Sequence, residues 1–181
     1  MGTDMYVEKV LRSKRKKEIK EIYETSFPKE ERMPFLLMLI MSCLWNTKFL
    51  AFYDEKILCG LVYMAAMGKQ TFIMFFAVDK NLRSRGYGSS ILKQIQTMYP
   101  KNKIIVSIEP CVDNAANLEQ RLKRKDFYIR NGYRETGYSM KLAGQEQEIL
   151  ISKGLFDKRK FIAFFIIYSS CTTIPKIWKH K

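Results

Sequence analysis

The feature that most constrains this fold is an apolar run that leads directly into a glycine-rich turn. Residues Thr71 to Val78 (TFIMFFAV) are apolar at almost every position, which is typical of a central strand buried on both faces. The chain then passes through Arg83-Ser84-Arg85-Gly86-Tyr87-Gly88 into Ser89 to Tyr99, which has the apolar spacing of a helix. A strand, a tight turn and a helix in this order predict an α/β protein.

The rest of the chain alternates between predicted strands and helices. The strands are expected at residues 5–11, 48–53, 57–66, 71–78, 103–108, 138–142 and 148–152. The helices are expected at residues 13–25, 30–44, 89–99, 114–131 and 158–169, with Ser13 capping the first and Glu30 and Glu31 opening the second. This order predicts a mixed α/β sheet with helices on its faces.

Length and charge bound the organisation and the partners. The chain has 181 residues, of which 32 are Lys or Arg and 18 are Asp or Glu, so its net charge is +14. We expect one domain over residues 1–152 and a basic, apolar extension over residues 153–181 that packs on the same domain. The positive charge favours polyanionic partners, among them nucleic acid, anionic lipid and phosphorylated cofactors.

Histidine and cysteine usage excludes several kinds of site. His180 is the single histidine, which excludes a Ser-His-Asp triad, an HExxH zinc site and a Cys-His pair in the body of the chain. We therefore expect no metal. The cysteines lie far apart, without CxxC spacing, and are expected to be reduced, mostly buried thiols of a cytoplasmic protein; they are Cys43, Cys59, Cys111 and Cys171.

No segment is long enough to cross a membrane, and we expect no membrane partner. The longest apolar run, Pro34 to Met41, is well short of the roughly 20 residues that a helical span requires. The N-terminal apolar stretch is interrupted by Glu8, Lys9 and Arg12, so it does not have the pattern of a secretory signal.

The turn after the central strand has the properties of an anion site. Gly86 and Gly88 leave the backbone uncovered, so a ligand can approach it closely. The first N–H groups of the following helix have no partner within the helix, and the helix dipole adds to their positive potential. Arg83 and Arg85 add fixed charge, so the segment suits a diphosphate.

Three other glycine patterns fail at identifiable positions. The dinucleotide fingerprint needs a third glycine where this chain has Ile91, and the Walker pattern needs a GK[ST] that the chain lacks. The stretch Arg85 to Gly88 matches the start of an RNA-recognition signature. That signature continues with Phe and Val, whereas Ser89 and Ser90 follow here and open a helix.

Two segments resemble the GNAT superfamily of N-acetyltransferases. Arg83, Gly86 and Gly88 are similar to its acetyl-CoA-binding motif, [RQ]-x-x-G-x-[GA], and Tyr128, Gly132 and Tyr133 are similar to its Y-x-x-x-G-[FY] element. The resemblance covers about residues 5 to 152. It implies a mostly antiparallel sheet of about six to seven strands, with central strands that splay at the cofactor site.

The resemblance also implies acetyl-CoA as cosubstrate and a set of residues that bind it. The backbone of the central strand borders the pantetheine arm, the glycine loop holds the diphosphate, and an asparagine on the next long helix contacts the cofactor. The matching residues are Phe76, Ala77, Val78, Arg83, Ser84, Arg85, Gly86, Tyr87, Gly88, Ser89 and Asn117. Many members place the asparagine seven residues before the tyrosine, where this chain has Arg121, so Arg121 is the alternative to Asn117.

The catalytic residues implied by the resemblance are a tyrosine and a carboxylate. Tyr128 matches the residue that protonates the departing thiolate, and a phenol with a pKa of about 10 is a suitable acid for a thiolate with a pKa of about 8.5. Tyr128 as a buried residue that only positions the thioester is the alternative. Glu109, at the end of a strand, is the first candidate for the base that takes the amine proton, and Glu31 is the second. Pairing of Glu109 with Arg121 or Arg124 is its structural alternative.

Three functions follow, from three classes. The first is an acetyl-CoA-dependent N-acetyltransferase in which a primary amine of a small molecule or peptide attacks directly in a ternary complex, with a homodimer as the candidate assembly. The second is a sensor or scaffold that binds acetyl-CoA without turnover. The third is a nucleic-acid-binding module, which needs aromatic side chains exposed on a sheet face, whereas the pattern at Phe72, Phe75 and Phe76 favours burial. No specific nucleic acid is therefore expected as a partner.

Overall fold

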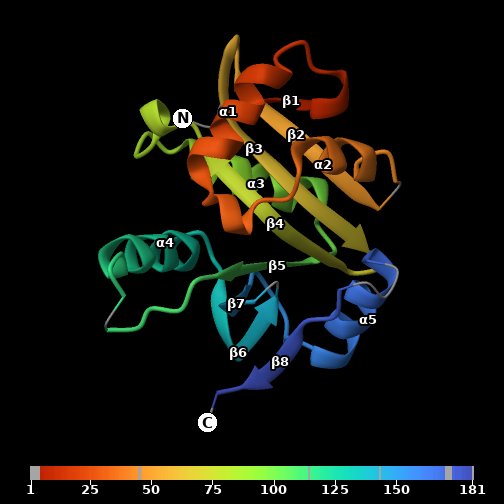
Figure 1. Cartoon of the computed structure of the whole chain (residues 1–181), viewed down its shortest axis with the longest axis vertical. Coiled ribbons are helices and arrows are strands. Elements are labelled where there is room, and N and C mark those ends of the chain that lie inside the picture. The colour runs from red at the N-terminus through yellow and green to blue at the C-terminus, as the bar shows by residue number, and fades with distance from the viewer. Residues whose placement is uncertain (1–4, 45, 114, 143, 170–172, 181) are drawn as a thin grey trace. The chain divides into compact units, whose positions relative to one another are not determined.

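The computed structural model describes residues 5–44, 46–113, 115–142, 144–169 and 173–180 (Figure 1). The chain folds into two compact units. The first consists of Met1–Ala66 and Ile73–Lys101, and the second of Met67–Phe72 and Asn102–Lys181. Strand β4 (Gln70–Val78) begins in the second unit and continues into the first.

The sheet of the first unit has the strand order β1-β2-β3-β4. Strand β1 (Tyr6–Lys9) pairs antiparallel with β2 (Thr47–Asp54), which pairs antiparallel with β3 (Ile57–Met67). Strand β3 is buried from Leu58 to Ala65, as the apolar sequence of this segment predicts for the interior of a sheet.

Helices cover both faces of this first sheet. Helices α1 (Lys16–Ser26) and α2 (Phe35–Met41) contribute Ile19, Tyr23 and Met38 to an apolar core. On β2 and β3 that core contains Phe49, Ala51, Leu61 and Tyr63, which are cross-strand partners on one face. Helix α3 (Tyr87–Met98) lies on the other face, where its Ile91 side chain meets the backbone of β3 at Gly60.

Two predicted helices in the first unit start or end elsewhere. Ser13 does not cap the first helix, because α1 begins at Lys16 and the Ser13 hydroxyl accepts the Arg15 N–H at 3.1 Å instead. The predicted helix 30–44 is divided into a short 3-10 helix η2 (Lys29–Glu31) and α2. The division falls at Pro34, which has no N–H to donate and disfavours helical backbone in the residue before it.

The sheet of the second unit has the strand order β4-β5-β7-β6-β8. The start of β4 is the parallel neighbour of β5 (Lys103–Ile108), and the other pairs are antiparallel: β5 with β7 (Gln145–Ile151), β7 with β6 (Arg134–Leu142), and β6 with β8 (Lys176–Lys179). The described residues therefore form eight strands. The expectation of six to seven is wrong because it lacks the strand in the C-terminal tail. Four residues are too short to show a strand period, so pairing with β6 defines β8.

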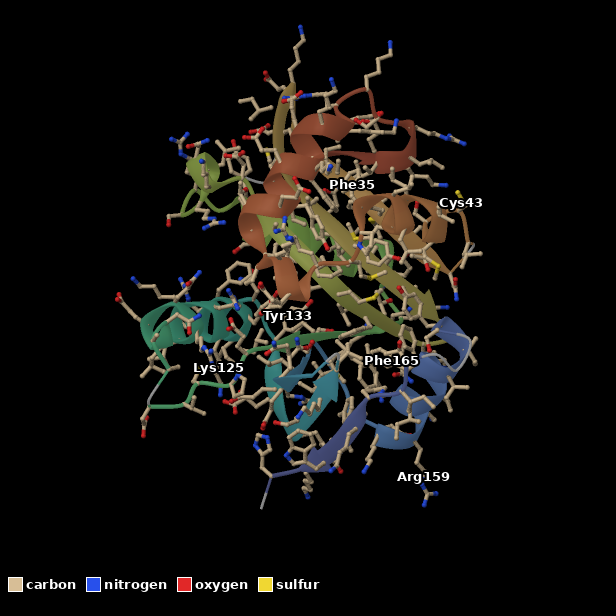
Figure 2. All side chains as sticks on the ribbon, viewed as in Figure 1. Phe35, Cys43, Lys125, Tyr133, Arg159 and Phe165 are labelled. Carbon is tan, nitrogen blue, oxygen red and sulfur yellow. The ribbon has the colours of Figure 1, made fainter. Side chains whose placement is uncertain are left out.

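Two helices belong to the second unit. Helix α4 (Leu118–Arg130) is tied to β6 and β7 by Lys125 (Figure 2), whose ammonium group is 3.0 Å from Glu135 and 2.9 Å from Glu148. Helix α5 (Lys158–Tyr168) packs its aromatic side chains, among them Phe161 and Phe165, around Phe72 at the start of β4. Residues 153–181 thus lie in the same unit as residues 102–152.

The expectations for the cysteines are met in part. Cys59 is buried and Cys111 is partly buried, but Cys43 is exposed; all three are free thiols. Cys171, and the predicted helix start at Asn114, lie outside the described residues. None of the helices that the structure describes combines the length and the hydropathy needed to cross a bilayer.

Candidate functional site

In the first unit, the segment Asp79–Ser89 connects β4 to α3, and we call it the anion loop. It contains a 3-10 turn, η3 (Lys80–Leu82), whose start is capped by the Asp79 carboxylate; this group accepts the Asn81 N–H at 2.8 Å. Ser84 has a φ of 62° and Gly86 a φ of +85°, so the chain reverses through left-handed backbone just before the helix. Only glycine adopts this conformation at Gly86 without steric cost.

The end of the anion loop presents unpaired amides. The Ser90 N–H donates to the Gly86 carbonyl at 3.0 Å and is the first helical hydrogen bond of α3. The N–H groups of Tyr87, Gly88 and Ser89 have no partner within the helix, because they lie in its first turn. Gly86, the N-cap residue, has no side chain that could accept from them. Such amides at a helix N-terminus bind phosphate groups.

The space beside these amides is open. A Cβ placed on Gly86 would meet no heavy atom within 4 Å, so the loop leaves the backbone accessible. Arg83, Ser84 and Arg85 are exposed, and the Arg83 guanidinium turns back toward the Val78 carbonyl at 3.5 Å. The loop fits a diphosphate because it combines bare amides, a helix dipole and the two exposed positive charges of Arg83 and Arg85.

The strand before the loop carries the backbone expected to border the pantetheine arm. Ala77 is buried, while Phe76 and Val78 are partly buried. Strand β3 approaches β4 very closely here, since a Cβ on Gly60 would lie 2.4 Å from the Ala77 carbonyl oxygen. Gly60 was not among the predicted site residues, although a glycine inside a strand pattern is the usual signal of close backbone approach.

In the second unit, Tyr128 lies on α4 and is 7% exposed. Its ring contacts the rings of Phe127 and Tyr133, at centroid distances of 5.2 and 5.4 Å. Burial raises the pKa of Tyr128 to about 12, although the nearby positive charge of Arg124 opposes the shift. Tyr128 is a neutral phenol at physiological pH, as an ordinary tyrosine is, and the raised pKa makes it a weaker acid than an exposed tyrosine.

Tyr133 follows the glycine that ends α4 and is even more deeply buried, at 2% exposure. Its hydroxyl oxygen has no hydrogen-bond partner in the described part of the chain. Burial, and then the neighbouring Tyr128, raise the pKa of Tyr133 well above the ordinary value. The phenol ring fills the space under α4, and its hydroxyl remains an unpaired polar group there.

Glu109 lies beside two arginines of α4. Its two carboxylate oxygens are 3.2 Å from the Arg121 guanidinium and 2.5 Å from that of Arg124. Arg121 also donates to the Asn117 side-chain oxygen at 2.7 Å and to the Pro110 carbonyl at 2.8 Å. We call Glu109, Asn117, Arg121 and Arg124 the Glu109 cluster. Glu109 is thus paired with both arginines, which is the structural alternative to its role as a base.

The predicted site residues thus fall into two groups. The first unit brings together the strand backbone and the anion loop: Phe76, Ala77, Val78, Arg83, Ser84, Arg85, Gly86, Tyr87, Gly88 and Ser89. The second unit brings together Tyr128, Glu109 and Asn117, with Arg121 and Arg124. Glu31, the second candidate base, is in η2 of the first unit and is half-buried. Among the described residues, no three His, Cys, Asp or Glu side chains gather in a way that could hold a metal ion.

The model of the acetyltransferase (GNAT) domain family matches residues 45–135, about half of the chain. The matched segment contains β2, β3, β4, the anion loop, β5 and α4. It therefore includes the glycine motif and the tyrosine of the second motif. No curated protein matches the sequence.

Solved structures show the same fold. A protein assigned to the GNAT acetyltransferases from Bacteroides thetaiotaomicron has a TM-score of 0.74 at 18% identity, over 90% of this chain and 98% of its own. The ribosomal-protein-S18-alanine N-acetyltransferase from Escherichia coli has a TM-score of 0.60 at 10% identity, over 84% and 96%. An aminoglycoside 6'-N-acetyltransferase complexed with coenzyme A has a TM-score of 0.61 at 11% identity, over 84% and 100%.

Proposed function

Since this chain belongs to the GNAT family of acetyltransferases, we propose that it transfers the acetyl group of acetyl-CoA to a primary amine by direct attack in a ternary complex. The observation that carries the proposal is the anion loop. Its left-handed Gly86, its uncapped helix start and its two exposed arginines suit the diphosphate of coenzyme A. A neighbour of the same fold is complexed with coenzyme A, which supports the choice of cosubstrate.

The proposed reaction forms a carbon–nitrogen bond, breaks a carbon–sulfur bond and moves two protons. Acetyl-CoA supplies a thioester, whose carbonyl carbon accepts the electron pair of the amine. The C–N bond forms, the C–S bond breaks, the amine nitrogen loses a proton and the leaving sulfur gains one. The protein's part is to orient the reactants, to accept the first proton and to donate the second.

Tyr128 is the proposed proton donor. Its hydroxyl is neutral at physiological pH and gives its proton to the departing sulfur, although the pKa that burial raises to about 12 makes this donation harder. The backbone of Phe76, Ala77 and Val78 is proposed to border the pantetheine arm, and the amides from Ser84 to Ser89 to hold the diphosphate. Asn117 is proposed to contact the cofactor; its side-chain oxygen already accepts a hydrogen bond from Arg121.

Glu109 is proposed as the base, with Glu31 as the alternative. A carboxylate that accepts a proton must lose part of its attraction to Arg121 and Arg124, so the Glu109 cluster opposes this role. The same cluster would also hold the two arginines in place if Glu109 were structural. The two roles predict a different pH dependence of kcat/KM in a variant that lacks the carboxylate.

The acceptor is proposed to be a primary amine of a small molecule or a peptide. The structural neighbours act on both kinds, since one is named for a ribosomal-protein alanine and another for an aminoglycoside. We propose a cytoplasmic protein on the basis of the three free cysteines that the structure describes, with a homodimer as the candidate assembly.

The nucleic-acid alternative requires exposed aromatic side chains for stacking, and Phe72 and Phe75 of β4 do not provide them. Phe75 is packed edge-on against Tyr23, and Phe72 lies among the rings of α5. Both side chains are buried, so neither is available to a base.

Calorimetric titration with acetyl-CoA at physiological salt tests the proposal, with inorganic pyrophosphate and a short DNA duplex as controls. We expect one-to-one binding of acetyl-CoA, much tighter than that of pyrophosphate, and its loss in Gly86→Glu, which adds bulk and negative charge beside the amides. Binding without transfer to any amine would favour the sensor. Failure of acetyl-CoA, with salt-sensitive binding of DNA, would refute the proposal.

A further inference from the structure

The anion loop is attached at both of its ends to the same short segment, the end of the β2–β3 hairpin at residues Asp54–Cys59. At the start of the loop, the Asp79 N–H donates to the Cys59 carbonyl at 2.9 Å. At its end, the Tyr87 hydroxyl donates to the Asp54 carboxylate at 2.9 Å. The hydrogen bond to Asp54 raises the pKa of Tyr87, which is the direction expected for a phenol that donates to a carboxylate.

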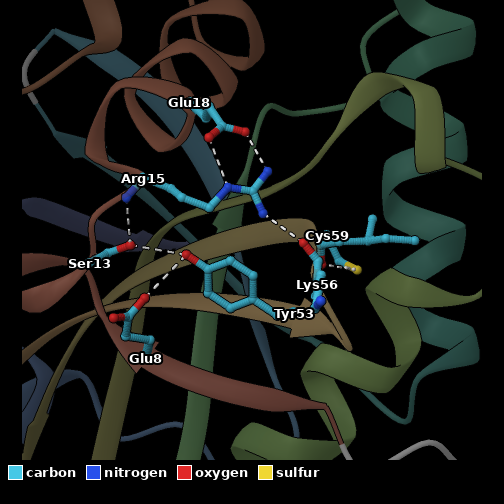
Figure 3. A network of polar contacts seen from close by, with 8 residues as sticks. Glu8, Ser13, Arg15, Glu18, Tyr53, Lys56 and Cys59 are labelled. Atoms are coloured by element: carbon cyan, nitrogen blue, oxygen red, sulfur yellow. Dashed lines mark hydrogen bonds and ion pairs between the residues drawn. The ribbon is translucent and has the colours of Figure 1, made fainter.

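The hairpin end is itself held by the N-terminal part of the chain (Figure 3). Arg15 donates to the Lys56 carbonyl at 2.8 Å and pairs through the rest of its guanidinium with Glu18. The hydroxyl of Tyr53, one residue before Asp54, lies 3.1 Å from that of Ser13 and 3.3 Å from the Glu8 carboxylate. The segment that holds the anion loop is therefore fixed on its other side.

The later part of the loop needs such an anchor because few of its own side chains hold it in place. Gly86 and Gly88 carry no side chain, and no side chain caps the helix start. Tyr87 lies between them and is the first residue of α3, so its side chain can fix how the first turn is rotated. The direction of the neighbouring N–H groups follows from that rotation.

We propose that Tyr87 and Asp54 are positioning residues, whose hydrogen bond holds the amides of the anion loop in the orientation that binds a diphosphate. The proposal rests on the proposed function for the identity of the ligand, but not for the geometry. It assigns Asp54, which no motif indicates, and gives the Tyr87 side chain a role that is separate from its backbone amide.

Electrostatics makes the proposal sharply testable. A carboxylate close to an anion site repels the ligand, so by charge alone the removal of Asp54 would tighten binding. If Asp54 is the anchor, its removal weakens binding, because the loop amides lose their orientation. The two effects have opposite signs, and the neighbouring exposed Glu55 supplies the matched loss of one negative charge.

The variants are Tyr87→Phe, Asp54→Ala and the double variant, with Tyr6→Phe and Glu55→Gln as controls. Tyr6 is 60% exposed on β1 and loses a hydroxyl without touching the loop. For acetyl-CoA and for inorganic pyrophosphate, we expect Kd to rise about five- to tenfold in each anchor variant, because the hydrogen bond orients the amides and does not itself contact the ligand. The double variant should bind the ligand no more weakly than the single variants do, because each single substitution already removes the same hydrogen bond.

Two further readouts separate positioning from a general loss of structure. In steady-state kinetics, KM for acetyl-CoA should rise in Tyr87→Phe while kcat and KM for the amine stay close to those of the unmodified chain. In the ligand-free protein, amide hydrogen exchange should become severalfold faster in residues 79–89 and remain unchanged in β2 and β3. Neither variant should lower the melting temperature more than the controls do.

The outcomes distinguish this inference from the proposed function. If the unmodified chain fails to bind acetyl-CoA but exchange in the loop still rises in Tyr87→Phe, the function is refuted and the anchor stands. If acetyl-CoA binds and the anchor variants match their controls in Kd and in exchange, the anchor is refuted and the function stands. Tighter binding in Asp54→Ala, equal to that in Glu55→Gln, also refutes the anchor.

Discussion

The ring of Tyr133 meets the ring of Tyr128 edge-on, with centroids 5.4 Å apart and planes at 68°. The two tyrosines are separated by one helix end, and the Tyr133 N–H donates to the Tyr128 carbonyl at 3.0 Å. Both are buried, and Tyr128 is the tyrosine that we propose as the acid. The Tyr133 ring supports the position of Tyr128, while the Tyr133 hydroxyl has no hydrogen-bond partner among the described residues.

Replacing Tyr128 with Phe tests the assignment of the acid. If the hydroxyl donates a proton to the leaving sulfur, kcat falls about 10²- to 10⁴-fold, because general acid catalysis contributes that much. The ring contacts with Phe127 and Tyr133 remain, so the Kd for acetyl-CoA stays the same. Steady-state kinetics measures kcat and calorimetry measures Kd. Full activity of Tyr128→Phe would mean that Tyr128 only positions the thioester.

The pKa of Tyr128 predicts how its contribution to stability depends on pH. In the folded chain the pKa is about 12, above the value of about 10 in an unfolded chain, so the unfolded state releases its proton first. The contribution is therefore complete below about pH 10 and is lost as the pH rises toward 12. Denaturant unfolding of the unmodified chain and Tyr128→Phe at about pH 9 and about pH 11 checks this sign, since the unmodified chain should lose more.

Tyr133→Phe should leave stability unchanged or raise it. The substitution removes a buried hydroxyl without a partner in the described residues and keeps the ring, so about 1 kcal/mol of desolvation cost is recovered. Tyr23→Phe is the matched control, because the Tyr23 hydroxyl donates to the Met33 carbonyl and accepts its N–H. Urea unfolding should show a loss of about 1 to 2 kcal/mol in the control; an equal loss in Tyr133→Phe would mean that its hydroxyl is bound.

Glu109→Gln distinguishes a base from a structural anchor. If Glu109 takes the amine proton, the loss of kcat/KM shrinks as the pH rises toward the pKa of the amine, because the amine then loses its proton unaided. Arg124→Gln is the control, since it breaks one ion pair of the cluster and leaves the carboxylate in place. If kcat/KM of Glu109→Gln falls by the same factor at every pH, and by as much as in the control, Glu109 only holds the two arginines in place.

The close approach of β3 to β4 predicts a steep size dependence at Gly60. A Cβ there would lie 2.4 Å from the Ala77 carbonyl oxygen, so Gly60→Ala should cost about 1–3 kcal/mol of unfolding free energy and Gly60→Val more. Gly68 is the control, because a Cβ there meets nothing within 4 Å and only its φ of +56° is unfavourable. Chemical denaturation should show a larger step from Ala to Val at Gly60 than at Gly68, where only the strain of a β-branched residue at positive φ is added, and equal steps would contradict the contact.

Much of the fold could be predicted from local pattern. The apolar runs at residues 57–66, 71–78 and 103–108 became β3, β4 and β5 almost as expected, because both faces of each strand are covered and the residues read as continuous apolar segments. The helix 89–99 was predicted two residues too late, since Tyr87 and Gly88 already have helical backbone. Element ends depend on caps and neighbours that periodicity does not record.

Some elements could not be predicted from pattern. Strand β8 exists because Lys176–Lys179 pairs with Tyr138–Lys141, and a strand of four residues carries no period of its own. Pro34 was read as part of a helix that it in fact interrupts. The strand depends on pairing with β6 and the break in the helix on a backbone restraint, and an apolar pattern records neither of them.

The sequence by itself determined the anion loop, since two glycines, two arginines and a helix start carry their chemistry in the local backbone. It also determined the family, which the matched domain model confirms. Only the tertiary structure decided that Glu109 is paired with Arg121 and Arg124 and that Tyr87 reaches Asp54, 33 residues away. It also decided that the Tyr133 hydroxyl has no hydrogen-bond partner in the part of the chain that the structure describes. These contacts join side chains distant in sequence, and their energies depend on burial and distance, which exist only after the chain has folded.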